Sequence, residues 1–212
     1  MTEIRNQDVW NSLCSRFTAD QQIIDRAWNE IDLAYRAPAR AYHTLVHISV
    51  LLNQIEEHTS VIENKAMLLF TTFYHDVVYT PGSGTNEKDS AAIAEKRMKE
   101  LHVPEEIIRD TKTLILLTKS HAEVNPSVTN DMLLFLDMDL SIIGARPEVY
   151  GQYCEHVREE FKVFPDFIFR KGRRSFLKSQ LKLPLIFHTE SFRNKYEVQA
   201  RLNIITELRE KL

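Results

Sequence analysis

The sequence predicts an all-α fold, and three observations support this prediction. Apolar residues recur three and four positions apart through most of the chain, which is the period of a helix with one buried face. The 212 residues include only 5 Gly and 7 Pro, too few for the turns of a many-stranded sheet. The β-branched runs are too short to outweigh this pattern. A chain of this length can bury a sizeable core, so we expect a single compact bundle of about ten helices.

The first half of the chain predicts four helices, at about 9–17, 21–35, 44–57 and 62–79. Thr18 and Asp20 are suited to cap the second helix, and the segment around Pro38 breaks it. The fourth helix is apolar on almost every side, so we expect it to lie at the centre of the core.

The second half predicts six more helices, at about 86–101, 104–118, 130–143, 147–163, 167–182 and 190–212. Pro104 and Pro147 fit the first turns of two of them. The one concentrated turn-forming segment is Pro81-Gly82-Ser83-Gly84-Thr85, directly after a histidine and aspartate pair. A loop in that place is suited to contact a substrate.

The charge and the composition limit the classes of partner that we expect. The net charge is −3, and the one basic run is Arg170-Lys171-Gly172-Arg173-Arg174. We therefore expect no nucleic-acid polymer as a partner. The basic run is typical of a solvated helix face, although it can also face an anionic substrate. The oligomeric state stays open.

The expected location is the cytoplasm. Cys14 and Cys154 lack the spacing of a disulfide framework or of a thiolate zinc site, which is typical of a protein of the reducing cytosol. The first residues lack the apolar core of a signal peptide, and no run approaches the roughly 18 apolar residues that span a bilayer. We expect no membrane partner.

The function is indicated by polar residues that lie inside or beside apolar stretches of the sequence. There are three pairs of such residues: His43 and His47, His75 and Asp76, and Asp137 and Asp139. A buried imidazole or carboxylate is costly unless it is hydrogen-bonded, paired or bound to a metal. Each pair alone is explained by a helix cap, a backbone hydrogen bond or solvent, but the three together favour a metal site. Imidazole and carboxylate ligands suit Mn, Fe, Co, Ni or Zn, and Mg less well.

The histidines of the first pair are four residues apart. If a helix begins by His43, both rings project from one face and can reach one site.

The order of these residues resembles the HD-domain metal-dependent phosphohydrolases. The matching motifs are Tyr42-His43-x-x-x-His47, His75-Asp76 and Asp139-Leu140-Ser141. The first motif is also similar to that of the cyclic nucleotide phosphodiesterases, distant members of the same helical superfamily. A small bacterial group of predicted HD phosphohydrolases is similar over most of the chain, through Asn86-Glu87-x-x-Ser90-Ala91, Leu136-Asp137-x-Asp139-Leu140 and Gly144. We therefore expect one HD-domain-like domain over residues 1–212, with its metal-site core at about 42–143 and flanking helices at both ends.

The resemblance implies a divalent metal ion held by His47, His75, Asp76 and Asp139. His43 would lie beside these ligands or donate a proton, and we count it among the catalytic residues with Asp76 and Glu87. Glu87 and Asn86 are suited to orient water or contact a sugar. The alternative for both is the start of a helix with an acidic first turn.

Spacing leaves open which aspartate of the third pair is the ligand, because residues two apart on a helix point in different directions. The resemblance favours Asp139, which leaves Asp137 to a hydrogen bond with a ligand histidine or a helix end. His121 lies where some family members place extra histidines for a second metal, and it is a candidate for that role or for binding phosphate.

The implied activity is metal-assisted hydrolysis of a phosphate ester, with a nucleotide or another small phosphorylated metabolite as substrate. Two alternatives stay open. One is a metal- or nucleotide-binding regulatory module without turnover, which would be marked by a missing ligand. The other is a di-iron oxygenase on the same scaffold, whose members carry more histidines than this chain.

Overall fold

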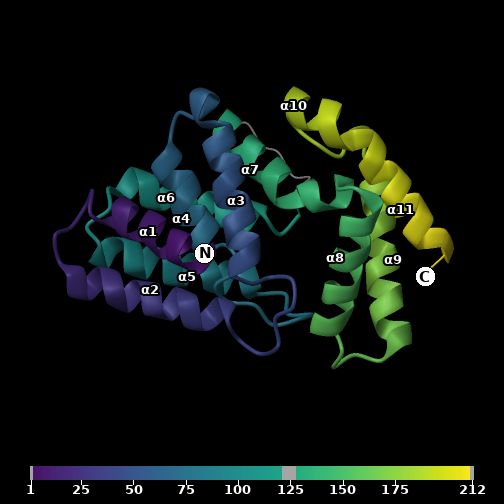
Figure 1. Ribbon diagram of the computed structural model, residues 1–212, viewed down its shortest axis with the longest axis horizontal. Helices are drawn as coiled ribbons and strands as arrows, with labels where there is room; N and C mark the ends of the chain where they lie inside the picture. Colours follow the sequence, from purple (N-terminus) through teal and green to yellow (C-terminus); the bar gives the residue numbers. More distant parts are fainter. Residues whose placement is uncertain (1, 121–127, 211–212) are drawn as a thin grey trace. The chain divides into compact units, whose positions relative to one another are not determined.

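The computed structural model describes residues 2–120 and 128–210, and these residues are mostly helical and contain no β-strand. They form eleven α-helices, one of them the three-residue α10 (Figure 1). The all-α prediction is confirmed. The helices group into two compact units, Met1–Lys119 and Ser120–Leu212, and the prediction of a single domain stays a prediction.

None of the helices in the described ranges is long and apolar enough to cross a membrane.

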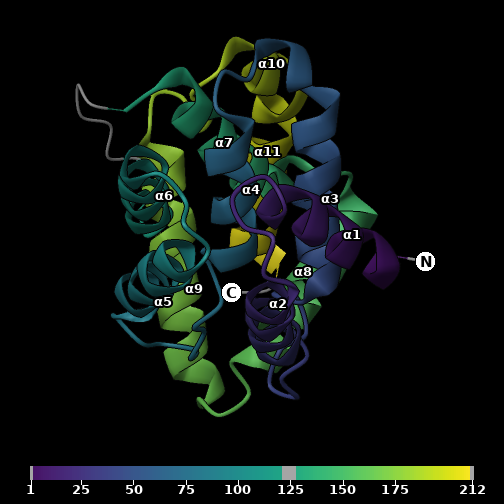
Figure 2. The same cartoon turned by 90° about the vertical axis from the view of Figure 1, so that its left-hand side faces the viewer.

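The first unit is built around α4 (Lys65–Tyr74), in which every residue from Ala66 to Tyr74 is buried. This helix packs against α3 (Leu45–Glu57), α5 (Asn86–Glu100) and α6 (Glu105–Leu117). Figure 2 shows α4 between α3 on one side and the neighbouring pair of α5 and α6 on the other. The helix that the sequence places at the centre is therefore the central helix of this unit.

Trp10 joins the two N-terminal helices, α1 (Thr2–Cys14) and α2 (Gln21–Tyr35), to this core. Its ring meets those of Phe70, Phe73 and Tyr74 on α4 edge-on, with ring centroids 5.2–6.0 Å apart. Its Nε1 donates a hydrogen bond to the carbonyl oxygen of Ile24 at 3.1 Å. Aromatic pairs of this kind stabilise a core beyond the area they bury.

The first helix begins at Thr2, well before the expected residue 9. The buried Asn6 holds this part of α1 against α3, because its amide nitrogen donates to Leu45 O at 3.0 Å and its oxygen accepts from Ser49 Oγ at 2.9 Å. A polar side chain makes this contact, so apolar periodicity does not mark it.

The central helix ends at Tyr74 and not near residue 79 as expected. Beyond it, side chains take over the backbone groups that a helix would pair: Arg40 donates to Val77 O, and Ser90 accepts from Val78 N. The apolar character of Val77 and Val78 continues the sequence pattern, but their hydrogen bonds do not continue the helix.

The second unit holds α7 (Asn130–Leu140), α8 (Pro147–Glu160), α9 (Asp166–Lys182) and α11 (Val198–Glu210). Figure 1 shows α8 and α9 as an antiparallel hairpin. Arg173 of α9 pairs with Glu207 of α11, with Nε and Oε1 2.9 Å apart, and Tyr150 of α8 donates its hydroxyl to the same carboxylate. All three side chains are buried, so this network ties three helices together.

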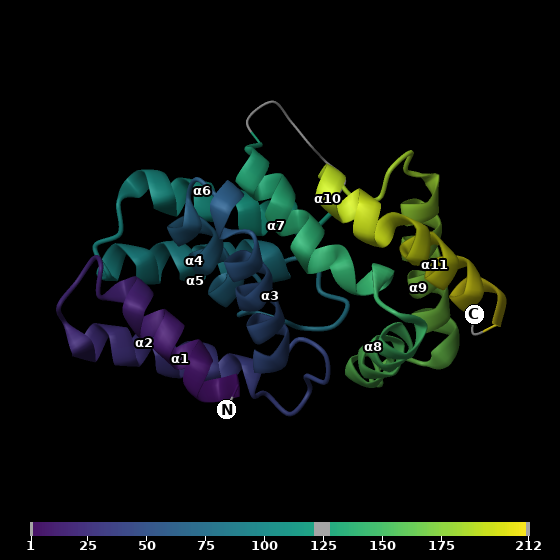
Figure 3. The same ribbon diagram turned by 45° about the horizontal axis from the view of Figure 1, so that its top comes forward.

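The expected C-terminal helix at 190–212 is interrupted. It consists of α10 (Glu190–Phe192), a π-helical turn (Arg193–Glu197) and α11, which follow one another in Figure 3. The carboxylate at the end of the wide turn, Glu197, accepts hydrogen bonds from the amides of Ile186 and Phe187. Apolar periodicity does not distinguish a wide turn from a regular one, so the sequence predicts one continuous helix.

Gly144 ends the short 3-10 helix after α7, and a Cβ at this position would lie 2.6 Å from Tyr196 Cβ and 2.8 Å from its carbonyl oxygen. We expect Gly144→Ala to lower the free energy of unfolding, measured by urea titration, by about 1–3 kcal/mol because two backbones must separate. Gly151→Ala in α8 is the matched control. Nothing lies within 4 Å of its Cβ, and alanine favours a helix over glycine by about 1 kcal/mol, so stability should rise. Equal stability of both variants would contradict the tight contact.

Candidate metal centre

Two buried histidines of the first unit face each other. His47 lies in the first turn of α3, and His75 is the C-cap residue of α4. Their side chains are 5% and 1% exposed, and their Nε2 atoms are 3.1 Å apart. The fold therefore brings two of the predicted ligands together.

The other ring nitrogen of His75 is fixed by the helix that precedes it. Its Nδ1 lies 3.0 Å from the carbonyl oxygen of Thr72. A carbonyl only accepts hydrogen bonds, so Nδ1 carries a proton, and Nε2 is the nitrogen that offers a lone pair when the ring is neutral. Metal-binding histidines are held in this way by an acceptor at the second nitrogen.

The spacing of the two Nε2 atoms fits a shared cation. Two nitrogen ligands about 2.1 Å from one ion and about 90–110° apart would stand roughly 3.0–3.4 Å from each other. The observed 3.1 Å lies within this range. A hydrogen bond from a protonated Nε2 of His47 to His75 explains the same distance, so the donor set permits a metal and does not require one.

Asp76 extends this group toward the surface. Its Oδ2 lies 3.2 Å from His75 Nε2 and 3.8 Å from His43 Nε2. Its side chain is 18% exposed, in contrast to the buried histidine beside it. The backbone amide of Asp76 donates to the hydroxyl of Tyr35 at 3.3 Å, which fixes the start of the turn after α4.

His43 precedes α3, whose N-cap residue is Thr44. The condition that a helix begins by His43 is therefore not met, and the spacing of four does not place His43 and His47 on one helix face. The rings still lie close, with centroids 5.9 Å apart. His43 also packs against the ring of Tyr79 at 4.3 Å, so contacts outside the helix set its position.

Arg40 connects the segment before α3 with the turn after α4. Its guanidinium donates to His43 O at 3.1 Å and to Val77 O at 3.0 Å. It lies over the ring of Tyr35 at 4.7 Å and 5.4 Å from the ring centre of Tyr79. Because a guanidinium offers several donors in a fixed plane, one side chain sets the separation of the segments that carry His43 and Asp76. The sequence marks Arg40 only as part of a helix break and gives no spacing signal for this role.

The loop that follows is held by α5. Asn86 accepts a hydrogen bond from Thr80 N and donates one to Thr80 O, both at 3.0 Å. Ser90 similarly bonds the amide and the carbonyl of Val78. Both Asn86 and Ser90 are buried, so the motif that contains them anchors the loop.

Glu87 lies in the first turn of α5, where its Oε2 is 3.6 Å from the ammonium group of Lys119. No hydrogen bond reaches this buried oxygen from the described part of the chain. The expected role of Glu87 in orienting water stays a prediction.

The two predicted aspartates lie in the second unit, on α7. Both oxygens of Asp137 are hydrogen-bonded to the segment before α10: Oδ1 accepts from His188 N, and Oδ2 accepts from Thr189 N and from its hydroxyl, at 2.6–2.7 Å. Burial raises the pKa of this carboxyl, while the three hydrogen bonds oppose the rise. Asp139 is half-buried near the end of α7, and its role as a ligand stays a prediction from the resemblance. His121 lies outside the described residues.

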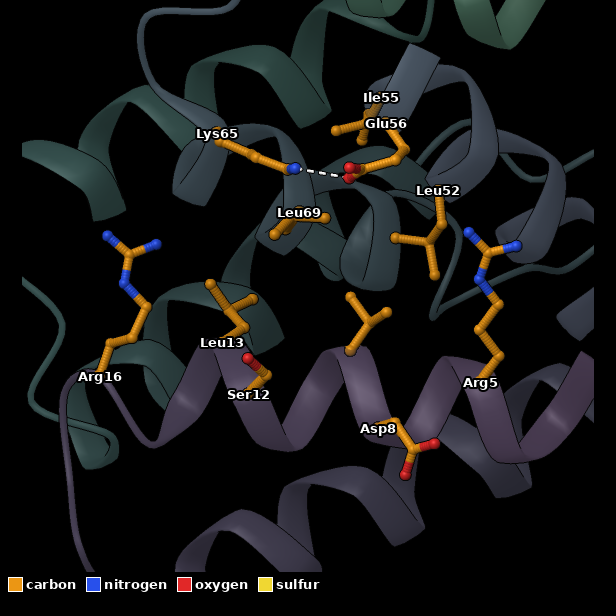
Figure 4. A pocket seen from close by; sticks show the side chains of 11 residues that line it. Arg5, Asp8, Ser12, Leu13, Arg16, Leu52, Ile55, Glu56, Lys65 and Leu69 are labelled. Carbon is orange, nitrogen blue, oxygen red and sulfur yellow. Dashed lines mark hydrogen bonds and ion pairs between the residues drawn. The ribbon is translucent and has the colours of Figure 1, made fainter. Parts of the chain in front are cut away.

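A hollow of about 450 Å³ lies elsewhere in the first unit, between α1 and the helices α3 and α4 (Figure 4). Arg5 and Arg16 stand at its two ends, and the ion pair of Lys65 and Glu56 lies across from α1. None of the predicted site residues lines it, and its leucine side chains are already buried. We assign no function to this hollow.

A scan against protein-family models, a search of curated proteins and a search of solved structures each found no match to this chain. Membership of the HD-domain family therefore stays a prediction from the motifs.

We expect Arg40→Met, which keeps much of the side-chain length but removes the donors, to lower the free energy of unfolding by about 1–3 kcal/mol, since two charge-assisted hydrogen bonds are lost. Urea titration measures this. Arg26→Met is the matched control, because Arg26 is 60% exposed and makes a single ion pair of 3.4 Å with Glu100. A surface pair of this kind contributes about 0–1 kcal/mol. Equal losses for the two variants would contradict the role of Arg40.

Proposed function

We propose that this chain is a metal-dependent phosphohydrolase of the HD-domain type, which cleaves a phosphate ester of a nucleotide or another small phosphorylated metabolite. The observation that carries the proposal is the pair of buried Nε2 atoms of His47 and His75, 3.1 Å apart, one of them fixed by a backbone carbonyl at its second nitrogen. Two imidazoles that meet in this way in a core are suited to a cation.

The proposed ligand set extends this pair. Asp76 contributes its Oδ2, which lies 3.2 Å from His75 Nε2. Asp139 is the fourth proposed ligand, and this part of the proposal rests on the sequence resemblance alone. Nitrogen and carboxylate donors accept Mn, Fe, Co, Ni, Zn or Mg, so metal identity is left to measurement.

A divalent ion bound there would lower the pKa of a bound water and neutralise charge on the phosphoryl oxygens. The residues around the ion would position it and supply a proton. Nδ1 of His75 keeps its proton in the hydrogen bond to Thr72 O, so Nε2 is the nitrogen of this ring that would bind the ion. His43 is 21% exposed, and its Nε2 faces Asp76 at 3.8 Å. It is the imidazole of this group placed to give a proton to a leaving oxygen.

Loss of a proposed ligand should remove the metal and leave the fold. We expect His75→Ala, Asp76→Ala and Asp139→Ala each to weaken metal binding by about 100-fold or more, since even residues that only support ligands cost about 10–100-fold. Elemental analysis and titration with Mn²⁺ or Co²⁺ measure binding, and circular dichroism measures the helical signal.

His156→Ala is the control for these variants, because His156 is exposed on α8 and should leave metal content unchanged. Asp137→Asn should also retain metal if Asp139 is the ligand. Unchanged metal content in His75→Ala would refute the proposed centre.

His43→Ala should lower kcat for a phosphate ester by about 10²–10⁴-fold, the usual contribution of a general acid, while metal content stays near that of the wild type. Release of phosphate from a panel of nucleotides and of generic phosphomonoesters and phosphodiesters, with each divalent metal added, measures the rate. If metal and rate fell together, His43 would be a ligand and not a proton donor.

A further inference from the structure

The turn between α8 and α9 presents large apolar side chains to solvent. Val163 and Phe167 are 74% and 72% exposed, and Ile168 is 44% exposed. The turn is the far end of the hairpin that α8 and α9 form in Figure 1. Three such side chains close together in sequence form an apolar tip, which in a water-exposed place indicates a surface that a partner covers.

The tip is held in a fixed shape. Arg158 donates to Phe161 O at 3.0 Å and to Phe164 O at 3.3 Å, and it pairs with Asp166 at 2.5 Å. Its guanidinium also lies over the ring of Phe169 at 4.9 Å. The apolar side chains are thus presented by an ordered turn.

A basic stripe runs from the tip along α9. The buried face of this helix carries Arg173, Leu177 and Gln180. Positions four, seven, eleven and fifteen residues after Phe167 share the opposite face at the helical period. These positions are occupied by Lys171, Arg174, Lys178 and Lys182, of which the three lysines are exposed and Arg174 is half-buried.

The cations of this stripe are not paired with carboxylates in the part of the chain that the structure describes. Within the described residues, no ion pair involves Lys171, Arg174, Lys178 or Lys182, nor Arg170 beside them. Residues 155–182 carry eight Lys and Arg against four Asp and Glu, a net charge of +4 in a chain whose net charge is −3. All six Lys and Arg of residues 170–182 lie on α9 with no Asp or Glu among them, whereas the four acids of the window lie in residues 155–166, so the positive charge is concentrated along α9 after the apolar tip.

We propose that the outer face of α9 and the apolar tip form a docking surface for an anionic lipid bilayer. The stripe would lie against acidic headgroups, and Phe167, Ile168 and Val163 would enter the region between headgroups and acyl chains. Neither contribution anchors a protein firmly by itself, but a basic patch and an apolar insertion act together. This proposal departs from the sequence-based expectation of no membrane partner, because it rests on the exposure of the tip, which the sequence does not reveal.

Other occupants fit less well. A nucleic acid would pair with the lysines, but the aliphatic Ile168 and Val163 find no match in a phosphate backbone. A second copy of the same surface would bring two positive stripes together, which costs free energy. An acidic bilayer satisfies the charge and the apolar tip at once.

The test is sedimentation of the full chain with vesicles of phosphatidylcholine, alone or with about one-third phosphatidylserine. We expect binding to the acidic vesicles only. Lys171→Gln and Lys178→Gln should each lower the partition coefficient about fivefold, the usual contribution of one cation near such a surface. Phe167→Ser should lower it roughly tenfold.

Val198→Ser is the matched control, because Val198 is 75% exposed but lies on α11, and it should bind as the wild type does. Circular dichroism checks that each variant is folded. The measurement needs neither metal nor substrate, so its outcome is independent of the proposed hydrolase function. Equal binding to neutral vesicles, no binding to either kind, or binding to DNA in a gel-shift assay without binding to vesicles would each overturn the proposal.

Discussion

The turn after α4 is the constraint on which the candidate centre depends. A helix that ended without replacement partners would leave backbone groups unpaired beside a core, and each such group costs about 1–3 kcal/mol. Here the side chains of Arg40, Ser90 and Asn86 form hydrogen bonds with backbone groups of residues 77–80. The same hydrogen bonds fix the direction in which the chain leaves His75 and Asp76. The requirement to satisfy a helix end and the requirement to hold functional side chains in place are therefore met by one set of contacts.

The sequence predicts the fold class and most helices because periodicity reports which faces are buried. It fails where polar contacts decide the structure. Asn6 extends α1, the partners of residues 77–80 end α4, and the wide turn before α11 interrupts the last helix. In each case a side-chain or backbone hydrogen bond replaces an apolar contact, and such bonds leave no periodic mark in the sequence.

In the candidate centre, too, some residues could be predicted from the sequence and others could not. His43, His47, His75 and Asp76 form one group because two lie at the start of α3 and two at the end of α4, and these helices pack together. The residues that position them are harder to foresee. Arg40, Tyr35 and Tyr79 act through backbone atoms and ring faces, and such contacts depend on how distant segments pack together. The two aspartates of α7 look alike in the sequence, but hydrogen bonds occupy both oxygens of Asp137 and tie it to the segment before α10.

The cationic side chains of this chain differ in how dissolved salt acts on them. Mobile ions screen exposed charges beyond about 8 Å at physiological ionic strength, and they screen partly buried charges much less. Arg40 lies against two tyrosine rings and bonds to backbone oxygens, so its contacts should persist in concentrated electrolyte. Lys178 is exposed on the outer face of α9, where ions reach it freely. The geometry of the histidine group is thus insulated from the ionic medium, whereas attraction at the outer surface of α9 varies with it.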